Sequence, residues 1–193
     1  KRGVVVAPFD AELFGHWWFE GPQFLRDVVL TMANDPSVRL LTAEEALYNH
    51  PVDKVMRLPE GSWGENGNHS VWINDRNKWY WEMEYRAEGQ LLKLIHGLPW
   101  QTNDAVKSML VRAARELLLL QGSDWAFVIH SYGAVDYGIQ RIGLHAARFD
   151  RCCLLAEKAA KGETFTDVEK SQIAEIDAHD SVFADIDLTW WQR

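Results

Sequence analysis

The residue best suited to acid–base chemistry is Asp10, which closely follows the apolar run Val4-Val5-Val6-Ala7. In α/β folds, catalytic side chains gather just beyond the carboxyl ends of buried strands. Asp10 could serve as a general acid if burial beside Trp17 and Trp18 raises its pKa. On spacing alone, an acid in this position more often caps the turn or helix that follows, so both roles are open.

A polar ring beside two flat aromatic surfaces follows a few residues later, at His16, Trp17 and Trp18. Aromatic rings stack on the apolar face of a pyranose, and an imidazole can hydrogen-bond a hydroxyl group. The three residues are therefore suited to binding a sugar. A corner of hydrophobic core containing a hydrogen-bonded histidine fits the same residues equally well.

A second candidate binding surface is the glycine-rich loop at 59–74, "PEGSWGENGNHSVWIN", which carries Trp63 and Trp72. Glycines permit sharp turns and a close approach of the backbone to a ligand. A loop that exposes tryptophan risks aggregation unless the ring is packed or binds something. Trp63 and Trp72 could be platforms for a ligand, or they could plug a compact loop into the domain.

The remaining candidates are weaker. Asp124-Trp125 is more often a helix cap followed by a core residue, and the histidines at 130, 145 and 179 are expected to be structural or at the surface. The aromatic stripe around Trp79 to Tyr85 is more often core. Because no C-x-x-C or H-E-x-x-H spacing occurs, we expect no metal and no cofactor.

The elements that must position these residues are mostly helices. The β-branched run 4–7 predicts one buried strand of the kind found in parallel sheets. Apolar spacing and capping residues predict helices at 22–34, 42–49, 75–96, 103–121, 123–132, 135–161 and 166–180. We therefore expect a mainly α fold, a helical bundle preceded by one strand whose partner strands lie outside this sequence.

Composition narrows the classes of protein further. The 193 residues are 47% hydrophobic and carry a net charge of −8, which argues against nucleic acid as a partner. No stretch reaches the roughly 20 apolar residues of a membrane helix, so no membrane partner is expected. The adjacent Cys152 and Cys153 predict reduced thiols and a cytoplasmic location, because a disulfide between neighbours is strained.

Three segments resemble glycoside hydrolase family 57, in the version found in its α-1,4-glucan branching enzymes. They are "APFDAELFGHWWFEGPQFL" near the start, "SWGENGNHSVWINDRNKWYW" in the loop region and "LLLLQGSDWAF" in the helical part. The resemblance spans essentially the whole chain and is strongest in the first twenty residues. It implies that residues 1–41 end an incomplete (β/α)7 barrel and that 42–193 form the helical C-terminal domain.

The family resemblance also implies roles for individual residues. Family 57 enzymes use two carboxylates in a retaining mechanism, and Asp10 matches the acid/base. By the same matching, His16, Trp17 and Trp18 line the cleft, and Trp63 and Trp72 hold an α-glucan chain. Asp124 and Trp125 lie in the third matching segment and are included among the expected substrate-binding residues.

The sequence departs from the family in ways that bear on activity. Ala11 stands where a hydroxyl residue is frequent, and Asn66 where glycine is common. The nucleophilic glutamate belongs to an earlier barrel strand, and Glu12 is too close to Asp10 to replace it. We therefore expect an inactive C-terminal portion of a longer branching enzyme, with the N-terminal barrel region as its partner. The alternatives are a non-catalytic α-glucan-binding or assembly module and a helical interaction domain without a sugar role.

Overall fold

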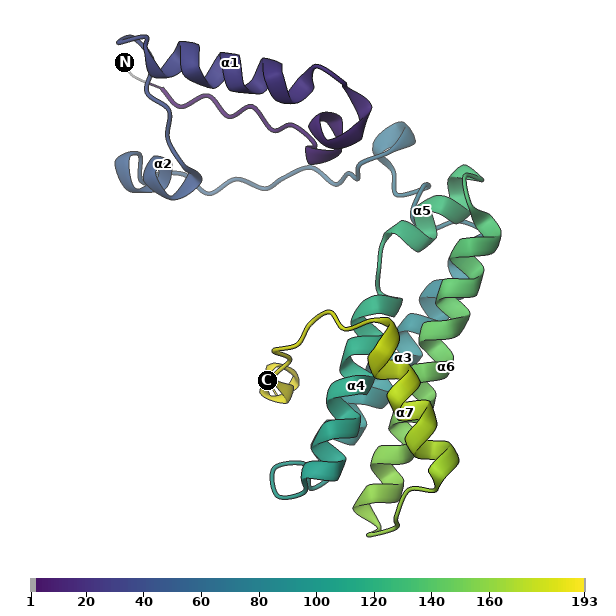
Figure 1. Cartoon of the computed structure of the whole chain (residues 1–193). Helices are drawn as coiled ribbons and strands as arrows, with labels where there is room; N and C mark the ends of the chain where they lie inside the picture. The colour runs from purple at the N-terminus through teal and green to yellow at the C-terminus, as the bar shows by residue number, and fades with distance from the viewer. Residues whose placement is uncertain (1–2, 193) are drawn as a thin grey trace. The chain divides into compact units, whose positions relative to one another are not determined.

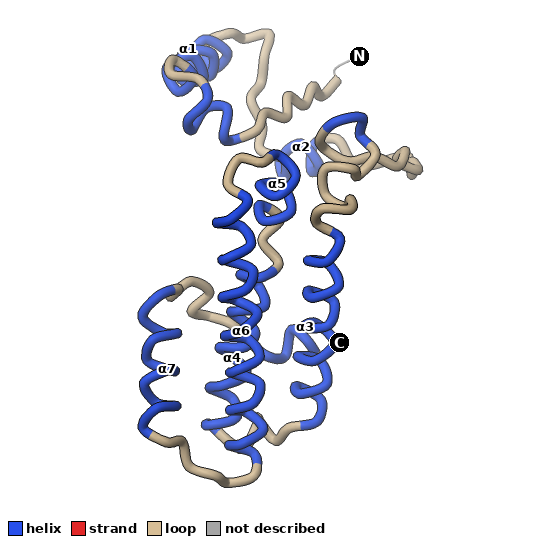
Figure 2. Tube along the Cα trace, turned by 90° about the vertical axis from the view of Figure 1, so that its right-hand side faces the viewer, coloured by secondary structure: helices blue, strands red, loops and turns tan. Residues whose placement is uncertain are grey.

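The computed structural model describes residues 3–192, and these residues divide into two compact units. Unit 1 is Lys1–Pro59 and unit 2 is Glu60–Arg193. The described residues form helices, turns and loops and contain no strand (Figure 2). The prediction of a mainly helical chain is therefore confirmed, whereas the proposed division between barrel and helical domain at 41/42 stays a prediction.

Unit 1 consists of short helices joined by irregular chain. A π-helical stretch, η1, runs over Leu13–Trp17, and α1 (Gly21–Ala33) and α2 (Ala43–Asn49) follow. At the start of α2, Thr42 and Glu45 form the predicted capping box, in which the Thr42 hydroxyl accepts from Glu45 N and the Glu45 carboxylate accepts from Thr42 N. The helices predicted at 22–34 and 42–49 are thus confirmed.

The strand predicted at 4–7 is not found. Residues 3–10 have no regular secondary structure, and Val5 is 93% exposed. A strand is stabilised by ladder hydrogen bonds to a neighbouring strand, and the described residues offer no such neighbour. Unit 1 also has almost no interior, because Gly21 is its only buried residue among those described.

Unit 2 is a helical bundle centred on two long antiparallel helices, α4 (Asp104–Leu120) and α6 (Val135–Ala160) (Figure 1). The short α5 (Asp124–Ser131) connects them, and α3 (Lys78–Gly97) packs against both. Helix α7 (Asp167–His179) follows α6, and two short 3-10 turns, η2 (Glu65–Gly67) and η3 (Leu188–Trp191), complete the unit.

Leucine, isoleucine, alanine and phenylalanine side chains fill the centre of the bundle. Leu110, Leu117 and Leu120 of α4 are fully buried with Phe149 of α6 and Leu91 of α3. The helical spacing of such residues predicted four of the five helices of unit 2 to within two residues at each end. The exception is α3, which begins three residues late because the Asn74 carboxamide oxygen accepts from Arg76 N and holds the chain in a turn.

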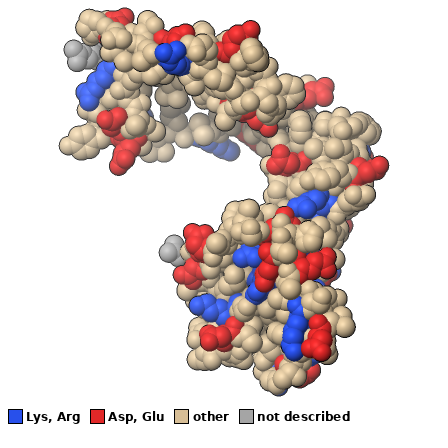
Figure 3. All heavy atoms as spheres, viewed as in Figure 1, with Lys and Arg blue, Asp and Glu red and all other residues tan. Residues whose placement is uncertain are grey.

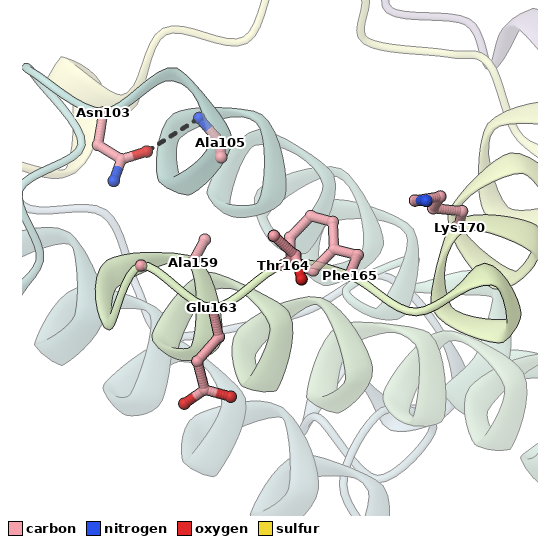
Figure 4. Close-up of a pocket in the computed structure, with 8 residues that line it drawn as sticks. Asn103, Ala105, Ala159, Glu163, Thr164, Phe165 and Lys170 are labelled. Carbon is pink, nitrogen blue, oxygen red and sulfur yellow. Dashed lines mark hydrogen bonds between the residues drawn. The ribbon is translucent and has the colours of Figure 1, made fainter.

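One end of the α4–α6 pair carries capping residues that the sequence signals indicated. The Asn103 oxygen accepts from Ala105 N at 3.1 Å at the start of α4 (Figure 4). Gly162, with φ of 77°, ends α6. Thr166 and Glu169 form the second capping box, and Lys158 Nζ donates to the Glu169 carboxylate at 2.8 Å. The hydrogen bond from Lys158 is the main reason that the pKa of Glu169 falls to about 2.

Candidate functional site

The loop that carries Trp63 and Trp72 has a defined, partly strained conformation. Gly64 has φ of 113°, and a Cβ there would lie 2.6 Å from Val71 Cγ2. Asn66 and His69 also have positive φ, at 61° and 68°. Non-glycine residues seldom adopt this region, and such residues gather at functional sites. The loop is therefore held in one shape by its surroundings.

Asn77, which is fully buried, connects this loop to α5. Its Nδ2 donates to Val71 O at 3.1 Å and to Ala126 O at 3.3 Å, and its Oδ1 accepts from Asn74 N at 2.8 Å. One amide side chain thereby satisfies backbone groups on two segments far apart in sequence. Asn74 Nδ2 adds a contact of 3.2 Å to His130 Nδ1 in α5.

Three aromatic rings meet where the loop reaches α5. The ring centroids of Trp63 and Trp72 are 6.1 Å apart, and Phe127 of α5 lies 5.8 Å from Trp63 and 6.1 Å from Trp72. Trp72 packs against the bundle core, whereas Trp63 is 65% exposed. The cluster therefore presents one open aromatic surface on a supported base, which is a suitable shape for stacking a sugar ring.

Asp124 and Trp125 have the surroundings of a helix start and a core residue. Asp124 is the exposed first residue of α5. Trp125 Nε1 donates to Leu119 O at 2.9 Å, and its ring is stacked with His145, with 6.4 Å between centroids. These contacts show that Trp125 packs within unit 2. A direct role of Asp124 or Trp125 in substrate binding stays a prediction.

The candidate acid, Asp10, lies in unit 1 at the start of a helical turn. Its side chain is exposed, and Oδ1 accepts from Glu12 N at 2.8 Å, the contact of a capping acid. Trp17 Nε1 donates to Glu12 Oε2 at 3.3 Å, and His16 Nε2 lies 4.0 Å from the same oxygen. Glu12 thus connects His16 to Trp17, a role that the sequence did not indicate.

The two tryptophans of unit 1 differ in their surroundings. Trp17 is 71% exposed and lies beside His16, with 5.1 Å between ring centroids. Trp18 packs within unit 1 between Phe14 and Phe24, at centroid distances of 6.1 and 4.9 Å. The π-helical turn over Leu13–Trp17 carries His16 and Trp17 and ends just before Trp18, and single π-helical turns are frequent at functional sites.

The sequence reasoning did not single out Glu84 or Glu116, and it did not identify the buried partner of His145. Glu116 of α4 and His145 of α6 are fully buried, with 2.7 Å between Oε2 and Nδ1. Glu84 of α3 is also buried, and burial raises its pKa. Each lies on the inward stripe of a helix, so helical spacing could have found them even though their partners lie on other elements.

The described residues offer little support for other kinds of site. No group of three or more His, Cys, Asp or Glu side chains in residues 3–192 could hold a metal ion. No helix in that range is long and apolar enough to cross a membrane. On the face of unit 2 drawn in Figure 3, basic and acidic side chains are interspersed, and Arg112–Asp177 and Arg148–Asp180 are among the ion pairs of the unit.

An open pocket lies at the α6–α7 connection, lined among others by Asn103, Glu163, Phe165 and Lys170 (Figure 4). The carboxylate of Glu163 points away from Phe165 in this view. Two of its polar side chains are already engaged elsewhere, because the Asn103 oxygen caps α4 and Lys170 Nζ donates to Asp167 Oδ1 at 3.1 Å.

The helical bundle has relatives among known proteins. Residues 84–191 match the family model described as 1,4-alpha-glucan branching enzyme, C-terminal. The 1,4-alpha-glucan branching enzyme of Thermococcus kodakarensis is 35% identical over 187 residues, which is 95% of this chain and 26% of that enzyme. A probable 1,4-alpha-glucan branching enzyme of Mycobacterium tuberculosis is 33% identical over 74% of this chain and 28% of its own length.

Solved structures give the same result. A GH57-type branching enzyme from Pyrococcus horikoshii has a TM-score of 0.86 at 35% identity and is matched over 100% of this chain and 35% of its own. The α-amylase AmyC of Thermotoga maritima has a TM-score of 0.72 at 27% identity, over 98% of this chain and 33% of its own. The chain thus spans roughly a quarter to a third of the length of these relatives, and it belongs to the family of C-terminal domains of 1,4-α-glucan branching enzymes.

Proposed function

We propose that this chain is the C-terminal part of a retaining 1,4-α-glucan branching enzyme of glycoside hydrolase family 57. The observation that carries the proposal is the similarity to branching enzymes over 95% of the chain, combined with the exposed Trp63 surface in unit 2. The reaction cuts an α-1,4 linkage and transfers the released segment to the 6-hydroxyl of a glucan. The α-glucan is therefore both donor and acceptor.

In this proposal Asp10 protonates the leaving oxygen and then accepts the proton of the acceptor hydroxyl. The nucleophile is a glutamate outside this sequence, on the N-terminal barrel, and must lie about 5 Å from Asp10 across the sugar. His16, Trp17 and Trp18 line the cleft beside it. Asp10 is exposed in this chain, so in this proposal the N-terminal barrel must exclude water from it before transfer can outcompete hydrolysis.

The apolar surface of unit 1 supports this arrangement. Val5 is 93% exposed and Phe19 is 96% exposed, although each such side chain gains about 1.5–3 kcal/mol when fully buried. We propose that the run 4–7 is the last strand of the incomplete barrel and that residues 1–41 pack on the rest of it. Residues 42–193 then form the helical domain.

Trp63 and Trp72 are proposed to hold the glucan chain. Trp63 supplies the exposed ring, and Phe127 and Trp72 pack against it. Asp124 and Trp125 begin α5, and in this proposal they contribute to the same glucan-binding site because α5 also carries Phe127. The buried free thiols of Cys152 and Cys153 are compatible with activity in a reducing cytoplasm on a glycogen-like glucan.

The test is Asp10→Asn in the full-length protein that contains this chain. Branching of amylose, followed by iodine staining and by chain-length analysis after debranching, should fall by about 10²–10⁴-fold, the usual contribution of a general acid–base group. Glucan binding should stay within about twofold of the unsubstituted protein. Asp27→Asn, an exposed acid of α1, is the matched control. Normal turnover in the Asp10 variant would refute the acid/base role.

A second candidate function is a non-catalytic α-glucan-binding module. The observation that favours it is that the Trp63 surface lies in unit 2, which has its own hydrophobic core. It requires the 193-residue chain to bind maltoheptaose and the full-length protein to leave amylose unbranched. Branching activity that depends on Asp10 would exclude it.

A further inference from the structure

Three tryptophans follow one another at intervals of nine residues and are joined in series by hydrogen bonds. The indole N–H of Trp81 donates to the carbonyl of Trp72 at 2.8 Å. The indole N–H of Trp72 donates to the carbonyl of Trp63, also at 2.8 Å. Each bond therefore fixes a ring and the backbone of the preceding tryptophan together.

The series runs from the core of unit 2 to its surface. Trp81 lies on α3 and packs against the core beside Tyr80, with 5.3 Å between ring centroids. Tyr80 is fully buried, and its hydroxyl donates to Leu120 O at 2.8 Å, which anchors this part of α3 to the end of α4. Trp72 is half-buried above it, and Trp63 ends the series as the exposed ring.

The loop that carries the two outer tryptophans depends on such contacts for its shape. It has no strand or long helix of its own, and Asn66 and His69 hold positive φ. An indole has a single donor, so satisfying it at a carbonyl fixes the plane of the ring as well as its position. A ring that stacks on a sugar must be held in a defined plane before the sugar arrives.

We propose that Trp81 is a positioning residue for the glucan-binding surface formed by Trp63 and Trp72. This inference rests on the proposed function for its ligand, an α-1,4-glucan chain, but the positioning itself can be measured without any ligand. Trp81 acts through Trp72 and does not touch the glucan. Removing its N–H should misplace Trp72 and, through it, the Trp63 ring.

Trp79 is a matched control on the same helix. Its ring is also half-buried and packs against the core, and its indole N–H donates to Arg76 O at 2.8 Å. That bond lies outside the series of three tryptophans. Trp79→Phe and Trp81→Phe therefore remove the same atoms and one indole hydrogen bond each, but only the second removes a bond to Trp72.

The first measurement uses the unaltered 193-residue chain. Its ten tryptophans give ten indole N–H signals in a ¹H–¹⁵N spectrum, which single Trp→Phe variants assign. The indole N–H of Trp72 and of Trp81 should exchange with solvent at least about tenfold more slowly than that of Trp63. Within the described residues, Trp63 Nε1 has no hydrogen-bond partner. Equal exchange rates for the three would overturn the series.

The second measurement compares the two variants of the same chain. Trp81→Phe should shift the indole signals of Trp63 and Trp72, speed exchange at Trp72, and weaken maltoheptaose binding by about fivefold to tenfold in a titration of tryptophan fluorescence. Trp79→Phe should leave the indole signals of Trp63 and Trp72, the exchange at Trp72 and the binding of maltoheptaose unchanged. Both variants should lower the unfolding midpoint similarly. Equal effects of the two variants on Trp63, Trp72 and binding would mean that Trp81 is only a packing residue and would refute the proposal.

The ligand-free signals separate this inference from the proposed function. If Trp81→Phe shifts Trp63 and Trp72 as expected but the unaltered chain does not bind maltoheptaose, the positioning stands and glucan as the ligand of this surface is refuted. If maltoheptaose binds and Trp81→Phe neither shifts the two signals nor weakens binding, the positioning is refuted and the proposed function is untouched.

Discussion

Replacing Asn77 with alanine should destabilise unit 2 far more than replacing an asparagine at the surface would. The Asn77 side chain makes three hydrogen bonds, to Val71 O, Ala126 O and Asn74 N, and it is fully buried. A hydrogen bond contributes about 0.5–1.5 kcal/mol net, so three give about 1.5–4.5 kcal/mol. The upper half of this range is expected, because the groups left without a partner are buried or half-buried.

The assay is urea unfolding of the 193-residue chain, followed by far-ultraviolet circular dichroism and by tryptophan fluorescence. The control is Asn68→Ala, in the same loop, where an exposed side chain accepts a single bond from Ser70 N at 3.2 Å. That change should lower the free energy of unfolding by less than about 1 kcal/mol. The fluorescence transition should shift most in Asn77→Ala, because Asn77 ties the tryptophan-bearing loop to α5.

A loss below about 1 kcal/mol for Asn77→Ala would refute this reasoning, since it would mean that water replaces all three bonds without cost. Equal losses in the Asn77 and Asn68 variants would carry the same meaning. Asn77→Asp is a further check on the mechanism. It keeps the acceptor for Asn74 N but removes both donors, so it should be at least as destabilising as alanine.

Two further predictions concern stability. The pKa of Glu169 is lowered to about 2 in the folded chain, against an ordinary value of 4.5, mainly through Lys158. The stabilisation from Glu169 is therefore present above about pH 4.5 and is lost as the pH falls toward 2. Glu169→Gln should flatten the pH dependence of the unfolding midpoint between these two pH values. An unchanged profile would contradict the assignment. Phe149→Ala should lower the free energy of unfolding by about 3–5 kcal/mol in the same urea assay, because the Phe149 ring is fully buried between helices. Leu154 is an exposed residue of the same helix, so Leu154→Ala should change the free energy of unfolding by less than about 1 kcal/mol.

Local signals predicted most of the helical architecture. The capping boxes at Thr42 and Thr166 act over three residues, and both are formed as predicted. The apolar spacing of α4 and α6 likewise reports a buried stripe within one helix. Signals of this kind are complete within a short window of sequence, so they can be interpreted without knowing what lies across the core.

The features that escaped prediction depend on residues far apart or on partners. The run 4–7 has the composition of a strand, but a strand forms only where another strand supplies its ladder bonds. His145 was expected to be structural or at the surface, and its buried contact with Glu116 joins positions 29 residues apart. The bonds that fix Trp63 and Trp72 follow from the tight loop, and neither composition nor periodicity specifies which carbonyl an indole will meet.

The buried Glu116–His145 contact has a consequence for how α4 and α6 can pack. Both helices present long apolar stripes, and such stripes tolerate sliding, because one aliphatic side chain can take the place of another. Shifting α6 by one turn, about 5.4 Å, would separate the imidazole from the carboxylate and leave each among apolar neighbours. An unpaired buried ionisable group costs several kcal/mol. The Glu116–His145 contact therefore disfavours packings in which α6 is shifted along α4, even if it adds little to the stability of the native packing.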